Sequence, residues 1–109
     1  MELITKVIKK RNGCIGIEFS YTETFRILRD ELNFRYTTVE SKMEFIRKEN
    51  GVSRIVEISD LKIVFRDYLR INYHLLNIPE GITLDILINS TYIKTPIYVN
   101  NSALKRELE

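Results

Sequence analysis

The sequence has a single cysteine, a single histidine and no tryptophan, and no apolar run in it approaches the ~20 residues that span a bilayer. Because Cys14 has no second cysteine to pair with, an intramolecular disulfide is excluded. The first residues also lack the pattern of a secretory signal peptide. We therefore expect a cytoplasmic protein that does not enter a membrane.

The common fingerprints of nucleotide, hydrolase and zinc sites are missing as well. The sequence contains no G-x-x-x-x-G-K-[ST] phosphate loop, no G-x-G-x-x-G, no G-x-S-x-G elbow and no Cys and His pairs at zinc spacing. Nucleotide hydrolysis, dinucleotide binding and structural zinc are therefore not supported. We expect neither a cofactor nor a bound metal.

Few side chains remain as candidates for catalysis. His74 could act as a general base, but no nucleophile or partner carboxylate lies at a readable spacing, and a capping or half-buried histidine is the simpler interpretation. Cys14 could be a reactive thiol, although a small buried hydrophobe is favoured. Asp60, Asp67 and Asp85 are interpreted as cap and surface charges. The sequence thus predicts a protein that is not an enzyme.

Length and composition indicate one domain. With 109 residues, of which 44% are apolar and 29% charged, the chain fits a single compact domain over residues 1–109. The 17 Lys and Arg residues exceed the 15 Asp and Glu residues by only two. Net charge alone therefore does not indicate a nucleic-acid partner, and any basic surface must be local.

The first third of the sequence predicts a hairpin followed by a helix. Residues 3–20 alternate as two strands around Asn12-Gly13, a pair that favours a type I′ turn, and Gly16 suggests a bulge or a close backbone approach. Thr22 is the predicted cap of a helix that ends near Asn33. Its expected apolar stripe is Phe25, Leu28 and Leu32.

An antiparallel meander of three strands and a long helix should follow. The strands begin at Phe34, are interrupted by the polar residues 40–42 and by Asn50-Gly51, and end with residues 53–58. Ser59 is the predicted cap of the helix, which should reach Tyr73 or Leu76. Its core-facing stripe is Leu61, Val64, Phe65, Tyr68 and Leu69.

The last third of the sequence is less regular. After a loop at residues 77–81, residues 82–88 fit a strand and a helix equally well, and Asn89-Ser90 should end that element. Pro96 favours an extended segment over residues 93–99. A short helix capped by Ser102 is expected at the end. The predicted fold class is α+β, with a mixed C-terminal segment.

The long helix carries the main candidate for a binding surface. Lys62, Arg66 and Arg70 recur every four residues, so they lie on one side of the helix and could contact successive phosphates of DNA or RNA. The alternative is a solvated helix face, diluted by nearby carboxylates. Five more basic residues could extend the surface: Arg26, Arg29, Lys9, Lys10 and Arg11.

Several segments resemble a known family. The run LNFRYTTVESKMEF (residues 32–45), the helix start Ile58-Ser59-Asp60 and the stretch from Gly81-Ile82 through Ile88-Asn89-Ser90 to Pro96 look like the segment that precedes the catalytic part of virulence-associated protein E-type primase-helicases, which occur in phages and conjugative elements. Thr37 stands where the family often has Asn, and the family's ATPase part with its phosphate loop is absent from this sequence. The resemblance therefore implies an accessory, non-catalytic replication module and transfers no active-site residue.

Two functional hypotheses follow. The first is a nucleic-acid-binding accessory domain of a phage or mobile-element replication protein, in which Lys62, Arg66 and Arg70 bind phosphates. The second is a small inhibitor or assembly factor of the counter-defence type that binds a host or phage protein through aromatic residues such as Tyr36 and Tyr92. The sequence leaves the oligomeric state open.

Overall fold

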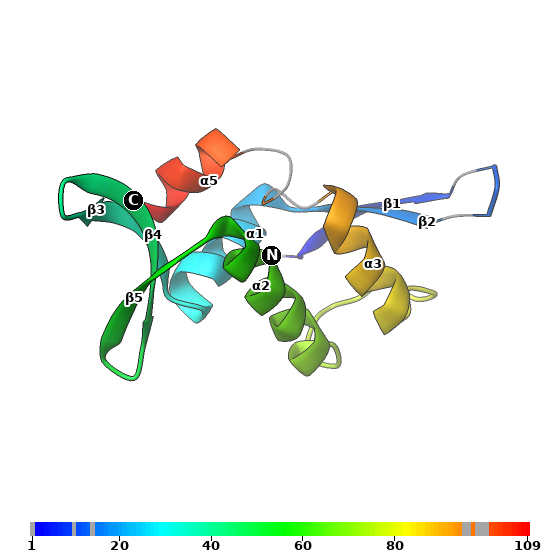
Figure 1. Cartoon of the computed structure of the whole chain (residues 1–109). Coiled ribbons are helices and arrows are strands. Elements are labelled where there is room, and N and C mark those ends of the chain that lie inside the picture. The colour runs from blue at the N-terminus through cyan, green and yellow to red at the C-terminus, as the bar shows by residue number, and fades with distance from the viewer. Residues whose placement is uncertain (1, 10, 14, 95–96, 98–100) are drawn as a thin grey trace.

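The computed structural model describes residues 2–9, 11–13, 15–94, 97 and 101–109, except for the side chains of residues 90–94. The predicted α+β class is confirmed: a hairpin and a three-stranded sheet lie toward opposite ends of the molecule, and helices pack between them (Figure 1). The principal extents are 50, 26 and 22 Å, so the molecule is elongated along the axis that joins the hairpin to the sheet.

The N-terminal hairpin consists of β1 (Ile4–Lys9) and β2 (Ile15–Phe19), which pair antiparallel as predicted. The predicted type I′ turn is wrong, because Lys9 pairs with Ile15 across a longer connection and only Gly13 of the Asn12-Gly13 pair has a positive φ, of 82°. Of the two alternatives at Gly16, the bulge is wrong, because Gly16 pairs regularly with Ile8. The register shifts between Ile4 and Lys6 instead.

The first helical segment consists of α1 (Tyr21–Arg26), which continues as a π-helix, η1 (Ile27–Glu31). Its cap is Ser20 and not Thr22, because the Ser20 hydroxyl accepts a hydrogen bond from the Glu23 N–H at 3.1 Å. The helix ends before Asn33, as expected, where φ is 59°. The predicted apolar stripe is buried: Phe25, Leu28 and Leu32.

The predicted meander is confirmed as β3 (Phe34–Val39), β4 (Lys42–Glu49) and β5 (Val52–Val56). Both tight turns have two residues with positive φ: Glu40 and Ser41 in the first, Asn50 and Gly51 in the second. The third strand ends at Val56 and not at residue 58, because the following helix begins at Ile58.

The long helix, α2 (Ile58–Asn72), ends where the sequence predicted. Its cap is Glu57 and not Ser59: the Glu57 N–H donates to the Asp60 carboxylate at 2.8 Å, which satisfies a backbone group at the helix start. The inner stripe of α2 is fully buried and consists of Leu61, Phe65 and Leu69. The Phe65 ring makes an edge contact with Phe19 of β2 at 6.4 Å, which joins the hairpin to the helical core.

The ambiguous segment is a helix, α3 (Leu84–Lys94), in which the Ile86 N–H donates to the Thr83 hydroxyl. The expected break at Asn89-Ser90 is therefore wrong, and the expected extended segment is wrong for residues 93 and 94, because packing of α3 on β2 and α2 keeps the chain helical. Residues 95, 96 and 98–99 of that prediction lie outside the described part. The terminal helix is confirmed as α5 (Asn101–Leu108), although Ser102 lies within it and is not its cap.

Candidate nucleic-acid interface

The basic residues of α2 do not share one exposed surface. Successive residues of a helix are turned by about 100°, so Lys62 and Arg66 lie beside the buried stripe and are half-buried. Arg70 is exposed, but its guanidinium lies 3.0 Å from the Asp67 carboxylate one turn earlier. Burial and ion pairing thus reduce the positive charge that this predicted stripe presents to a phosphate backbone.

The outward face of α2 is instead rich in aliphatic side chains. Ile63, Ile71 and Leu75 are 56%, 78% and 84% exposed, and Leu75 lies in the turn that directly follows the helix. Ile63 lies nearly opposite the buried stripe, Ile71 lies about 80° further round the helix, and Leu75 follows the end of α2. This face was not predicted, because the inward-facing apolar stripe is the stronger signal in the sequence.

Arg26 and Arg29 lie on the α1–η1 segment and are both neutralised by carboxylates. Arg26 donates to Glu23 at 2.9 Å and to Glu31 at 3.2 Å, and these hydrogen bonds raise the pKa of the guanidinium. Arg29 lies 3.0 Å from Asp30, which raises the pKa of Arg29 and lowers that of Asp30. Neither cation retains an unshared charge for a phosphate.

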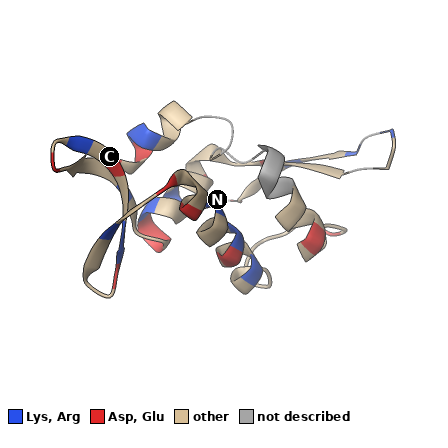
Figure 2. Cartoon of the chain, in the orientation of Figure 1, with Lys and Arg blue, Asp and Glu red and all other residues tan. Residues whose placement is uncertain are grey.

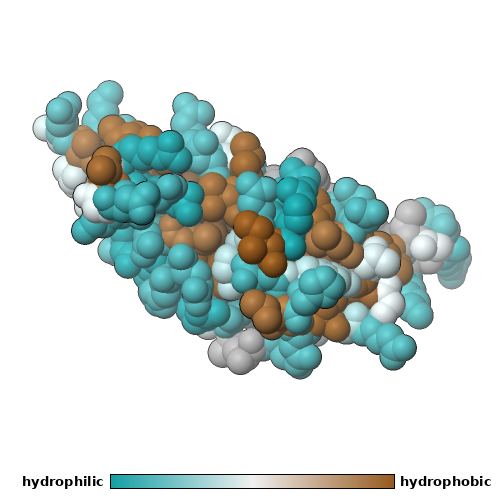
Figure 3. Space-filling model, turned by 90° about the horizontal axis from the view of Figure 1, so that it is seen from below, coloured by the Kyte–Doolittle hydropathy of each residue, from teal (hydrophilic) through white to brown (hydrophobic). Residues whose placement is uncertain are grey.

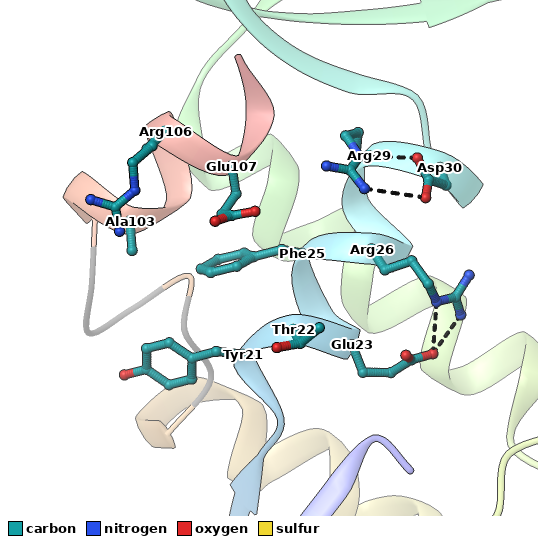
Figure 4. A pocket seen from close by; sticks show the side chains of 10 residues that line it. All are labelled: Tyr21, Thr22, Glu23, Phe25, Arg26, Arg29, Asp30, Ala103, Arg106 and Glu107. Carbon is teal, nitrogen blue, oxygen red and sulfur yellow. Dashed lines mark hydrogen bonds and ion pairs between the residues drawn. The ribbon is translucent and has the colours of Figure 1, made fainter. Parts of the chain in front are cut away.

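The same two arginines line a pocket of about 810 Å³ between α1–η1 and α5 (Figure 4). The Phe25 ring lies between Glu107 and Tyr21 in the view of Figure 4 and makes an edge contact with the Tyr21 ring, with 5.9 Å between the centroids. Arg106 of α5 also lines the pocket and was not foreseen, because no local pattern connects it to residues eighty positions earlier. Three arginines and three carboxylates line the pocket, so it has no net charge: Arg26, Arg29, Arg106, Glu23, Asp30 and Glu107.

The hairpin holds the net charge of the chain. The first 20 residues contain four Lys or Arg against two Glu, whereas residues 21–109 contain thirteen of each sign, so the whole excess of two positive charges lies in this segment. Lys6, Lys9 and Arg11 are exposed and form no ion pair with any described residue. Lys10 lies outside the described residues.

The tip of this hairpin projects beyond α3, away from the other predicted basic residues (Figures 1 and 2). The seven described members of the predicted surface therefore do not form one continuous patch. They separate into a tip cluster, a paired group on α1–η1 and a partly covered group on α2. Of these, only the tip cluster combines exposure with unshared charge.

The residues predicted for protein binding or considered for catalysis were Tyr36, Tyr92, Cys14 and His74. Tyr36 is half-buried, with its ring 4.8 Å from that of Phe45 and the Lys105 amine 5.3 Å away. The side chain of Tyr92 and residue Cys14 lie outside the described part. His74 is exposed and not half-buried, because it lies in the turn after α2, and its ring centroid is 5.4 Å from that of Tyr73.

Within the described ranges, no group of three or more His, Cys, Asp or Glu residues could hold a metal ion, and no helix is both long and apolar enough to cross a bilayer. No protein-family model, curated protein or solved structure significantly matches the chain.

Proposed function

We propose that the protein is a non-enzymatic nucleic-acid-binding domain and that the N-terminal hairpin is its contact element. The observation that carries this proposal is the concentration of the chain's net positive charge in the β1–β2 hairpin, whose described cations are exposed and unpaired. This differs from the initial hypothesis, in which the α2 stripe was the primary contact and the hairpin tip only extended it.

The shape of the hairpin supports a duplex as the partner. A two-stranded β-ribbon fits the major groove of B-DNA, whereas the major groove of A-form RNA is too deep and narrow for such readout. Lys9, Lys10 and Arg11 are consecutive, so they could contact phosphates on both sides of a groove as the ribbon enters it. Arg70 and the two arginines of α1–η1 would then make secondary contacts with the duplex or no contact at all.

The resemblance to primase-helicases of the virulence-associated protein E type supplies a biological setting for this proposal. In that setting the domain would be an accessory module of a phage or mobile-element replication protein and would hold DNA without processing it. The proposal assigns no catalytic residue and no cofactor to the chain.

Fluorescence anisotropy with labelled duplex DNA, single-stranded DNA and duplex RNA tests the proposal. Binding dominated by phosphates should weaken steeply with salt, with a slope of log K against log salt of about −0.9 for each duplex phosphate neutralised. We expect duplex DNA to bind more tightly than duplex RNA. Lys9→Ala/Lys10→Ala/Arg11→Ala should weaken duplex binding at least roughly tenfold and flatten the salt slope by up to about 2.7.

A matched control variant distinguishes the loss of the hairpin-tip site from a general loss of positive charge. Lys42→Ala/Lys48→Ala/Arg54→Ala removes the same number of cations from exposed positions on the three-stranded sheet and should change the affinity much less. Lys62→Ala/Arg66→Ala/Arg70→Ala tests the original helix-face hypothesis directly. Equal losses in all three variants, or no binding at low salt, would contradict the hairpin proposal; absence of binding would favour the protein-binding alternative.

A further inference from the structure

The outward face of α2 is an aliphatic surface with a pair of opposite charges at its centre. Asp67 and Arg70 lie between Ile63 on the N-terminal side and Ile71 and Leu75 on the C-terminal side, and all five side chains are exposed. Figure 3, which views the molecule from below, shows apolar side chains among hydrophilic ones on the side that carries α2. Large exposed aliphatic residues grouped on one helix face are typical of an interaction surface.

The order of these residues is self-complementary under a two-fold axis. If two copies of α2 pack antiparallel with the axis midway between Asp67 and Arg70, Asp67 of each copy lies level with Arg70 of the other. Two reciprocal ion pairs then form at the centre, where each carboxylate also keeps its own Arg70 at 3.0 Å. A parallel arrangement would bring like charges together and is disfavoured.

The same axis also matches the aliphatic residues. The level opposite Ile63 falls at the exposed His74 of the second copy, just beyond the end of its α2, so Ile63 packs against the last turn and the following turn, beside Ile71 and Leu75. Because the pair is two-fold symmetric, Ile63 of each copy makes this contact, once on each side of the charged centre. One register therefore satisfies both the charges and the apolar side chains.

We infer that the outward face of α2 binds a second copy of this chain, as an antiparallel two-fold helix pair centred between Asp67 and Arg70. A single helix face is smaller than the ~800 Å² that each partner contributes to a standard interface, so we expect a reversible dimer with a Kd in the micromolar range or above. The inference does not depend on nucleic-acid binding, because the face lies outside the hairpin.

Sedimentation analysis without nucleic acid, from about 1 µM to about 500 µM protein, tests the inference. The unmodified chain should pass from monomer to dimer over this range. Asp67→Lys and Arg70→Glu should each be monomeric at concentrations at which the unmodified chain is dimeric, because each variant places like charges opposite one another in both pairs. Circular dichroism melting verifies that both variants remain folded.

A mixture of the two variants is the most specific measurement. In a heterodimer of Asp67→Lys with Arg70→Glu, both opposing pairs again have opposite signs, so an equimolar mixture should dimerise although neither variant does alone. A merely structural effect of the substitutions would not produce this rescue. A mixture that stays monomeric while the unmodified chain dimerises would overturn the proposed register.

Apolar substitutions test the flanks of the interface. Ile71→Glu should abolish the dimer, whereas Ile55→Thr, at a comparably exposed position on β5, should leave it unchanged. A chain that remains monomeric throughout the concentration range would overturn the inference and leave a different protein as the occupant of the face. A dimer that survives Ile71→Glu would place the interface elsewhere and would equally overturn it.

Discussion

The hairpin tip and helix α2 each carry three closely spaced basic residues, but the fold treats the two groups differently. At the tip, Lys9 and Arg11 are exposed and form no ion pair with a described residue. On α2, Lys62 and Arg66 are half-buried beside the core, and Arg70 is paired with Asp67. The spacing of cations in the sequence therefore places a basic stripe on one side of an element, but burial and neighbouring carboxylates decide whether its charge is available to a ligand.

The first prediction concerns stability, for which the two regions should differ most. Phe65→Ala removes a ring that is almost fully buried and contacts Phe19, and it should lower the free energy of unfolding by about 3–5 kcal/mol. The triple alanine variant of the hairpin tip removes the exposed side chains of Lys9 and Arg11 together with that of Lys10, and it should change the free energy of unfolding by less than about 0.5 kcal/mol per residue. Urea titration followed by circular dichroism measures both. A large loss in the tip variant would mean that its cations stabilise the fold.

The second prediction concerns the start of α2. Asp60→Ala removes the carboxylate that accepts from the Glu57 N–H, so it should lower the free energy of unfolding by about 1 kcal/mol. Ser59→Ala alters the residue that the sequence alone suggested as the cap, and its effect should be within about 0.5 kcal/mol. The same urea titration compares the two variants. The reverse order would restore Ser59 as the cap.

The third and smallest prediction concerns alkaline pH. Burial raises the pKa of the Tyr68 hydroxyl above its ordinary value, because the charged phenolate is poorly solvated there. The unfolded chain therefore loses this proton at a lower pH than the folded chain, so this contribution to stability is present below the ordinary pKa and is lost as the pH rises through the raised one. Tyr68→Phe should lose less stability than the unmodified chain between about pH 9 and about pH 11. Identical profiles of stability against pH for the two proteins would contradict a raised pKa of Tyr68.

Most elements of the fold could be predicted because turn pairs and the period of the apolar residues mark them in the sequence. Asn50-Gly51 marked a turn that has the expected positive φ angles, whereas Glu40-Ser41 adopts similar angles without a typical turn pair. The caps Ser20 and Glu57 each lie two residues before the predicted Thr22 and Ser59, because several neighbouring polar side chains could serve as a cap. The position is fixed by tertiary contacts, such as the Ser20 N–H that donates to the Leu3 carbonyl at 2.7 Å.

Tertiary packing decides where the local pattern leaves two possibilities open or hides an ion pair. The apolar residues from Ile82 to Ile88 suit a strand and a helix, and contacts of α3 with β2 and α2 select the helix. The pairing of Arg26 with Glu31 was also hidden, because residues five apart approach one another where the helix becomes a π-helix. The candidate residues were visible in the sequence, but their ion pairs were not.

The central claim is that the hairpin, and not α2, is the contact element for nucleic acid. The most direct measurement is a titration of isotope-labelled protein with a short DNA duplex, followed by two-dimensional NMR of the backbone amides at low salt. If the hairpin is the contact element, the largest changes in chemical shift fall within residues 4–19 and fade as salt is added. Shift changes concentrated on residues 58–72, with the hairpin unaffected, would contradict it.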